Sequence, residues 1–377
     1  MTEPDLAAEL DELRRRILDD LGAADARYIR TVIRTQRTLE LAGRAVLFGS
    51  LFPPAWLAGV TCLSLSKILD NWEIGHNVLH GQWDWLRDPR IHSAAWEWDM
   101  YMPAAQWKDS HVHHHLYTNV VDRDRDLGFG YLRISPEQPW HPLNLAQPLY
   151  AIGLAVCFDA MLLPYDAELE RVLTGRKDIR EIDGKLRAGA RKTLTLATKE
   201  YLLFPLLTGP CAATTLTANL ASELVRNLWS AAIVLCGHLP AGIATFPERC
   251  LANESRGDWY ARQLRGSADI SGGRILHVLS GHLSFQIEHH LFPDLPSNRY
   301  PEIAPEVRRI CARHGLPYHR GRLVPQLLTV VGKILRYSLP ARISNAASVS
   351  RSAAASIPGK RFRSGTVVRQ ATMPKSM

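Results

Sequence analysis

The spacing of the histidines restricts the possible folds of this chain more than any other feature. Eleven of the fifteen histidines lie in three short clusters, within residues 76–80, 111–115 and 277–290, or stand alone at His238. On a helix, residues three and four positions apart point the same way. Three such sets result: His76 with His80; His111 with His114 and His115; and Gln286 with His289 and His290. If the three faces converge, their imidazoles overfill one site of about four to six ligands, so the pattern favours two metals.

Two simpler explanations of these histidines were weighed. A single histidine is more often a hydrogen-bonded core residue than a metal ligand, and a histidine-rich tract can merely scavenge metal. Neither explanation requires helical spacing to recur in clusters spread over more than 200 residues. The recurrence therefore favours a built metal site.

Charge and cysteine content narrow the possible partners. The 377 residues carry a net charge of +8, which favours an anionic lipid, an acidic protein or a nucleic acid as partner. No nucleic-acid-binding motif accompanies the charge, so we expect no nucleic-acid partner. The six cysteines form no CxxC pair, which argues against disulfides, iron–sulfur clusters and thiolate zinc sites, and fits a reducing compartment.

Composition divides the chain into three parts. Residues 1–40 begin without a signal peptide and predict an amphipathic cytosolic helix over about 5–40. Residues 41–337 form the predicted main domain, with apolar runs at 41–75 and 200–243. Residues 338–377 are rich in Ala, Ser and Arg, contain no acidic residue, and are expected to be a disordered basic tail.

The apolar runs predict an all-α integral membrane protein with four transmembrane helices in two hairpins. Residues 165–199 hold nine Lys or Arg, which favours a cytoplasmic location and makes 143–164 an interfacial or re-entrant segment, with Pro148 and Pro164 as expected breaks. Both termini and every histidine cluster then lie in a cytosolic helical cap. The competing interpretation is a soluble helical protein, and the charged residues within the runs are its best support: Arg44, Lys67 and Arg226.

The ordered histidine motifs carry a family resemblance. The chain contains HxxxH at 76–80, HxxHH at 111–115 and QxxHH at 286–290, in that order. The flanking strings are His-Gly-Gln-Trp-Asp-Trp, His-His-Leu-Tyr-Thr-Asn and Gln-Ile-Glu-His-His-Leu-Phe-Pro. Over about residues 28–320 the chain resembles the membrane fatty acid desaturases, and is most similar to actinobacterial acyl-CoA or acyl-lipid desaturases.

The resemblance implies a diiron centre that uses dioxygen to insert a cis double bond into a long acyl chain carried on CoA or a lipid. It also implies a location in a bacterial cell membrane. Eight residues match the family's ligand positions: His76, His80, His111, His114, His115, His238, His289 and His290. Gln286 and His282 are two further candidates, either as ligands or as hydrogen-bonding residues, with His282 expected one turn before Gln286 on the same helix face.

Residues around the ligands were also assigned by their position near the motifs. Carboxylates should orient the imidazoles, but we expect the run Asp122–Asp126 to be a solvated surface. Trp83, Trp85 and Trp107 are expected either to line the acyl tunnel or to lie in an interfacial aromatic belt. The basic residues of 165–199 are equally consistent with binding a CoA phosphate or anionic lipid.

An external electron donor is required, because dioxygen takes four electrons and the substrate provides two. The sequence has no flavin, haem or nucleotide motif, so we expect a ferredoxin or an NAD(P)H-dependent flavin/iron–sulfur oxidoreductase as a separate partner. A fatty acyl hydroxylase on the same centre is the first alternative. A histidine-rich membrane metal transporter fits less well, since the histidines flank the apolar runs instead of lying within them. A zinc protease is disfavoured because Asn77 stands where HExxH has glutamate.

Overall fold

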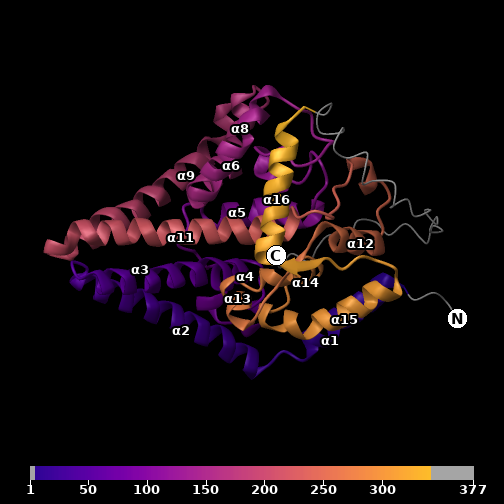
Figure 1. The fold of residues 1–377 in the computed structure, drawn as a ribbon. Coiled ribbons are helices and arrows are strands. Elements are labelled where there is room, and N and C mark those ends of the chain that lie inside the picture. Colours follow the sequence, from indigo (N-terminus) through magenta and orange to yellow (C-terminus); the bar gives the residue numbers. More distant parts are fainter. Residues whose placement is uncertain (1–4, 341–377) are drawn as a thin grey trace.

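A computed structural model describes residues 5–340, and most of the predicted C-terminal tail therefore lies outside the described residues. The described part is almost entirely helical (Figure 1), which confirms the predicted all-α class. The exception is a parallel pair of three-residue strands, β1 (Asp269–Ser271) and β2 (Arg320–Arg322).

Two long helical hairpins form one half of the molecule and taper to the left in Figure 1. The first joins α2 (Ala23–Val46) to α3 (Pro53–Ile68). The second joins α9 (Ile179–Thr198) and α10 (Phe204–Leu207) to α11 (Ala212–His238). Large apolar side chains are exposed at both hairpin tips: Phe48, Leu51, Phe52, Leu206 and Leu207. Such a surface suits lipid better than water.

Shorter helices build a cap at the other end of the hairpins. They are α1 (Leu6–Asp19), α4 (Asn77–Leu79), α5 (Ala104–Tyr117), α8 (Leu169–Leu173), α12 (Arg256–Gly266), α13 (Arg274–Leu279), α14 (Gln286–Leu291), α15 (Tyr300–Arg313) and α16 (Leu323–Ser338). In α1, Leu10, Leu13 and Ile17 are buried against α12, α14 and α15. The N-terminal helix is therefore part of the core of the cap.

The single N-terminal helix predicted over 5–40 is wrong in its continuity and its end. The chain breaks between α1 and α2, and α2 then continues to Val46, well into the first apolar run. Gly22 precedes α2, and its backbone N–H donates to Asp25 Oδ2 at 3.0 Å. This capping interaction starts a new helix where the amphipathic pattern alone shows no interruption.

Two arms of the hairpins contain π-helical turns. α3 runs directly into the π-helix η2 (Leu69–His76), which α4 follows, and α9 runs into the π-helix η7 (Lys199–Leu203). A π turn closes hydrogen bonds to the fifth residue instead of the fourth, and such turns occur frequently at functional sites. Here η2 ends at the first residue of the first histidine motif.

Residues 143–164 form a sharply bent pair of helices. α6 (Gln147–Val156) and α7 (Phe158–Asp166) meet at an angle of 106°. The bend lies at Cys157, so the prediction that Pro148 and Pro164 break this segment is wrong: Pro148 starts α6 and Pro164 lies inside α7. Within residues 5–340, one helix, Gly209–His238, is long and apolar enough to cross a membrane, and the bent pair is the other candidate.

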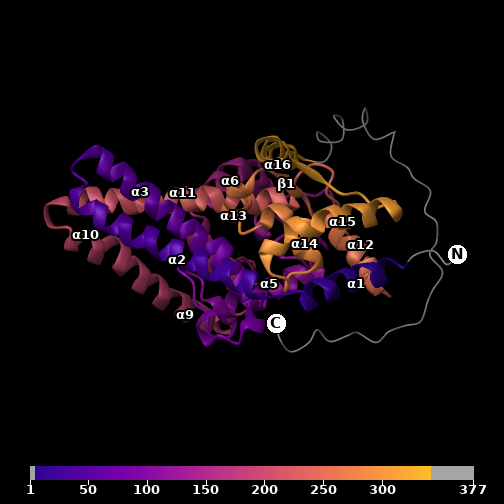
Figure 2. The same ribbon diagram turned by 90° about the horizontal axis from the view of Figure 1, so that it is seen from below.

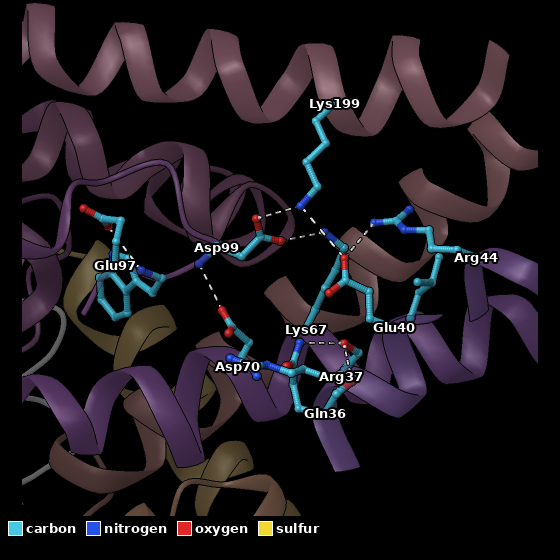
Figure 3. A pocket seen from close by; sticks show the side chains of 12 residues that line it. Gln36, Arg37, Glu40, Arg44, Lys67, Asp70, Glu97, Asp99 and Lys199 are labelled. Atoms are coloured by element: carbon cyan, nitrogen blue, oxygen red, sulfur yellow. Dashed lines mark hydrogen bonds and ion pairs between the residues drawn. The ribbon is translucent and has the colours of Figure 1, made fainter. Parts of the chain in front are cut away.

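Charged residues lie buried where the two hairpins meet the cap (Figure 3). Lys67 Nζ is 3.3 Å from Glu200 Oε2, 3.4 Å from Glu223 Oε2 and 3.7 Å from Asp99 Oδ2. Arg44 and Arg226 complete the cluster through Glu200 and Asp159, each at 2.5 Å. A half-open cavity of about 260 Å³ adjoins it. The charges that favoured a soluble core thus neutralise one another inside the helix bundle.

Candidate metal centre

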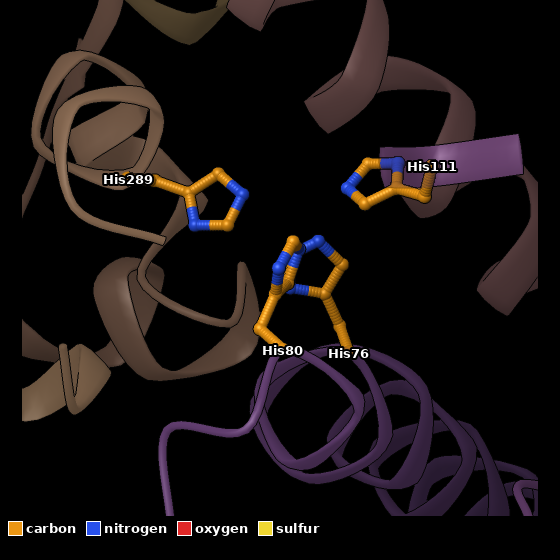
Figure 4. A group of neighbouring side chains, drawn as sticks. All are labelled: His76, His80, His111 and His289. Atoms are coloured by element: carbon orange, nitrogen blue, oxygen red, sulfur yellow. The ribbon is translucent and has the colours of Figure 1, made fainter. Parts of the chain in front are cut away.

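The three histidine motifs converge in the cap. The ligand atoms of His76, His80, His111 and His289 all lie within 4.8 Å of one another. His76 ends η2, His80 follows α4, His111 lies on α5 and His289 on α14. Figure 4 shows the four rings facing a common point from three separate segments. This arrangement gives one compact set of four imidazoles.

A second set lies beside the first. His114, His238 and His290 also place their ligand atoms within 4.8 Å of one another, with His238 Nε2 at 3.2 Å from His114 Nε2 and 3.0 Å from His290 Nε2. His115 stands between the two sets. Its ligand atom groups with those of His289 and His290, and its Nε2 is 3.2 Å from His111 Nε2.

The chemistry of these imidazoles fits metal binding. Burial first, and then repulsion by neighbouring imidazoles, lowers the pKa of His80, His115 and His289 well below the usual value, so these rings are neutral donors. His80 Nε2 and His115 Nδ1 are buried without a hydrogen-bond partner. Two imidazole nitrogens that bind one metal at about 2.1 Å and at right angles lie about 3.0 Å apart. The observed nitrogen pairs at 3.0 to 3.2 Å match that spacing.

Comparison with known proteins decides the family. The sequence profile of the fatty acid desaturases matches residues 54–322. This chain belongs to that family. It is 42% identical over 340 residues, 89% of this chain and 80% of the relative, to an NADPH-dependent stearoyl-CoA 9-desaturase of Mycobacterium tuberculosis. It is 29% identical over 216 residues, 56% of this chain and 48% of the relative, to an acyl-lipid (7-3)-desaturase of Rebecca salina. It is 33% identical over 111 residues, 29% of this chain and 23% of the relative, to fatty acid desaturase 3 of Homo sapiens.

These matches confirm the family resemblance read from the histidine motifs. They also confirm that the enzyme is an oxidoreductase of the acyl desaturase type and that its histidine clusters belong to a desaturase domain. The family is membrane-associated, which agrees with the apolar hairpin tips.

Carboxylates of the 122–126 run hold His114 in this desaturase. His114 Nδ1 lies 3.0 Å from both oxygens of Asp124, which also accepts backbone N–H groups of Asn119 and Asp126. Burial opposes a charge on His114, but Asp124 and Asp126 outweigh it and raise the pKa to about 9. The prediction that this run is a solvated surface is therefore wrong at Asp124, which is buried, and holds at Asp122, which is exposed.

Other residues that orient the imidazoles were missed by the sequence analysis. Each contacts the Nδ1 atom of its histidine: Asn77 for His76 at 3.2 Å, Gln263 for His290 at 3.1 Å, the Gly266 carbonyl for His238 at 3.2 Å, and Tyr300 for His289 at 3.4 Å. Gln263 and Gly266 lie on α12, far from any histidine motif in sequence. Such contacts fix which nitrogen faces the metal, and the sequence offers no local signal for them.

The two additional ligand candidates lie in different places. Gln286 Nε2 is 2.9 Å from His238 Nε2, beside the second set. His282 has left-handed backbone torsions (φ 55°) and its Nδ1 lies 2.8 Å from Glu73 Oε2, a carboxylate that also accepts from Tyr28 and Ser297. The expectation that His282 shares a helix face with Gln286 is wrong, because α14 begins only at Gln286.

The three tryptophans named as substrate contacts also differ in position. Trp107 stacks on His111 with ring centres 4.3 Å apart and packs against His76 and His80. Trp83 is fully buried and stacks on Tyr28, and Trp85 is half-buried. Of the three, Trp107 is the one that contacts the histidines. It lines a small opening with Leu79, Lys108 and Val112 that reaches His80 and His111.

Proposed function

We propose that this enzyme inserts a cis double bond into a long-chain fatty acyl-CoA, at a histidine-held diiron centre and with electrons from a separate NADPH-linked donor. The convergence of the box histidines into two adjacent sets is the observation that carries the proposal. The stearoyl-CoA 9-desaturase relative makes stearoyl-CoA the first substrate to test and carbon 9 the first position.

The two sets assign the ligands. His76, His80, His111 and His289 would hold one iron, and His114, His238 and His290 the other, with His115 between them and Gln286 beside the second. When bound, the two irons supply the dioxygen activation needed to remove hydrogen from unactivated methylene carbons. His282 is left out of the proposed set because its Nδ1 is engaged by Glu73.

The surrounding residues would position the acyl chain and exclude water. Trp107, Leu79 and Val112 present apolar surface at the opening beside His80 and His111. Trp107 lies flat on His111, with 20° between the ring planes, so it limits how a chain passes that imidazole. Lys108 at the same opening adds a positive charge where a substrate carrying phosphates would enter.

The membrane arrangement follows from the hairpins. We propose that both hairpins insert with their apolar tips across the bilayer, which gives four transmembrane segments and leaves both termini and all box histidines cytoplasmic. The exposed apolar residues at the tips and the nine basic residues of 165–199 support this orientation.

The reaction can be tested by expressing the enzyme in a host with a matching reductase and mapping double bonds in the cellular fatty acids by mass spectrometry. We expect new monounsaturated chains that depend on the intact histidines. Incorporation of oxygen-18 from labelled dioxygen into the lipid product would instead identify a hydroxylase.

Replacing Asp124 by asparagine tests the carboxylate that orients His114. The amide loses the charge that holds the Nδ1 proton, and outer partners of this kind are worth about 10- to 100-fold in metal affinity. We expect iron affinity to fall by that factor in chelator competition. Asp122→Asn is the matched control, since Asp122 is exposed on the same segment and should change nothing.

Replacing His282 by alanine tests its exclusion from the ligand set. Iron per protein should stay at the wild-type value, while the free energy of unfolding falls by about 1–3 kcal/mol because buried Glu73 loses one partner. Iron analysis and thermal unfolding measure the two effects. A loss of half the iron would return His282 to the ligands, and His290→Ala provides the reference for such a loss.

A further inference from the structure

The last described helix, α16, carries an apolar stripe that no other part of the described chain covers. Val324, Leu328, Val331, Leu335 and Leu339 follow one another at intervals of four, three, four and four residues, and all are exposed, Leu328 by 67%. The opposite side of α16 is buried through Gln326, Val330 and Ile334. The helix thus has one face in the protein core and one apolar face outward.

A second exposed apolar surface lies next to the first. α6 exposes Leu149, Ile152 and Val156, and the preceding turn exposes Leu143 and Leu145. α6 and α16 pack together, and the Gln147 side-chain amide at the start of α6 donates to the Ile334 carbonyl of α16 at 2.9 Å. Figures 1 and 2 both show the two helices side by side. The two stripes therefore belong to one region of the surface.

The charge around this region is strongly positive. From Val307 to Met377 the sequence contains fourteen Lys or Arg and no Asp or Glu. Arg320, Arg322 and Arg336 are exposed near the two ends of α16, and none of them forms an ion pair within residues 5–340. A helix with an apolar stripe flanked by unpaired basic residues is the pattern that binds anionic lipid head groups from the membrane surface.

We propose that α6 and α16 form an interfacial seat that lies in an anionic membrane surface, in addition to the inserted hairpins. A second copy of this chain fits the surface less well, because it would bring two basic regions together. The apolar stripes explain why so much apolar surface is exposed beside the cap, outside the hairpin tips.

The seat also braces one of the metal-binding segments. Thr329 of α16 accepts the Ala241 N–H at 3.1 Å, and Lys333 Nζ donates to the Pro240 carbonyl at 3.4 Å. Both contacts hold the loop that follows His238, and Gln326 additionally donates to the Asp269 carbonyl of β1 at 3.1 Å. Contact with lipid at α16 therefore fixes the backbone on which His238 depends.

Site-directed spin labelling of the full-length iron-loaded enzyme in lipid nanodiscs tests the seat without measuring desaturation. Single cysteines at 324, 328, 331 and 335 sample the stripe, and cysteines at 329 and 336 sample the polar side of the same helix. Ala312, exposed on α15, provides a site outside the seat. The partly exposed Cys62, Cys157 and Cys250 are first replaced by serine.

In nanodiscs containing phosphatidylglycerol, we expect the four stripe labels to be more accessible to dissolved oxygen than to a water-soluble nickel chelate, and the three control labels to show the reverse. Replacing Arg320, Arg322 and Arg336 by glutamine, or the lipid by pure phosphatidylcholine, should reduce that contrast at least twofold. Equal chelate access at stripe and control labels would overturn the proposal. So would spin–spin broadening between copies, which would indicate self-association. Either result leaves the double-bond assay, and with it the proposed reaction, unaffected.

Discussion

Replacing His289 by alanine is expected to abolish fatty acid desaturation. The His289 ligand atom lies within 4.8 Å of those of His76, His80 and His111, and it also groups with His115 and His290, so its loss affects both sets of imidazoles. Even the outer partners of metal ligands are worth about 10- to 100-fold. We therefore expect activity to fall by more than about 100-fold, together with loss of bound iron.

Double-bond quantification and iron analysis of the purified protein check this result. His113→Ala is the matched control, because His113 is exposed on the same α5 helix as the second motif and stacks on Tyr117 instead of facing the other histidines. An active His289→Ala enzyme with its full iron content would refute the assigned ligand set.

Replacing Lys67 by methionine is expected to cause the largest loss of stability. Lys67 Nζ lies within 4.0 Å of carboxylate oxygens from Asp99, Glu200 and Glu223, and only 7% of its side chain is exposed. Methionine fills similar space but leaves buried carboxylates without their shared cation. Breaking a buried ion pair by removing one partner costs about 3–5 kcal/mol.

Thermal unfolding of the detergent-solubilised protein, followed by tryptophan fluorescence, should show the midpoint falling by several degrees. Arg15→Met is the control, since Arg15 pairs with Glu12 and Asp19 on the exposed side of α1, where such pairs contribute at most about 1 kcal/mol. An unchanged midpoint in the Lys67 variant would mean that water in the adjoining cavity solvates the carboxylates.

The sequence predicted the site where the chemistry depends on local spacing. Imidazoles three and four residues apart share a helix face wherever a helix forms, so the facing of His114 and His115, or of His289 and His290, follows from the order of residues alone. The same argument failed at His282, because a left-handed residue there ends the preceding helix and α14 begins four residues later.

The contacts that orient the histidines could not be predicted in this way. Glu73 and His282 are 209 residues apart, and Thr118 and His290 are 172 apart, so their proximity is a product of the whole fold. The helix breaks at Gly22 and Cys157 were missed for a related reason. One depends on a capping interaction and the other on the packing of a bent pair, and neither interrupts the apolar pattern.

The π-helical turn η2 has a consequence for how the first motif tolerates change. A π turn holds one more residue than an α turn, so it sets the rotation of everything that follows it. Deleting one residue between Leu69 and Gly75 would restore α geometry and swing His76 and His80 about 100° around the helix axis. All eight imidazoles would remain in the sequence, yet two would point away from the others. The length of this segment is thus as strict a requirement as the histidines themselves.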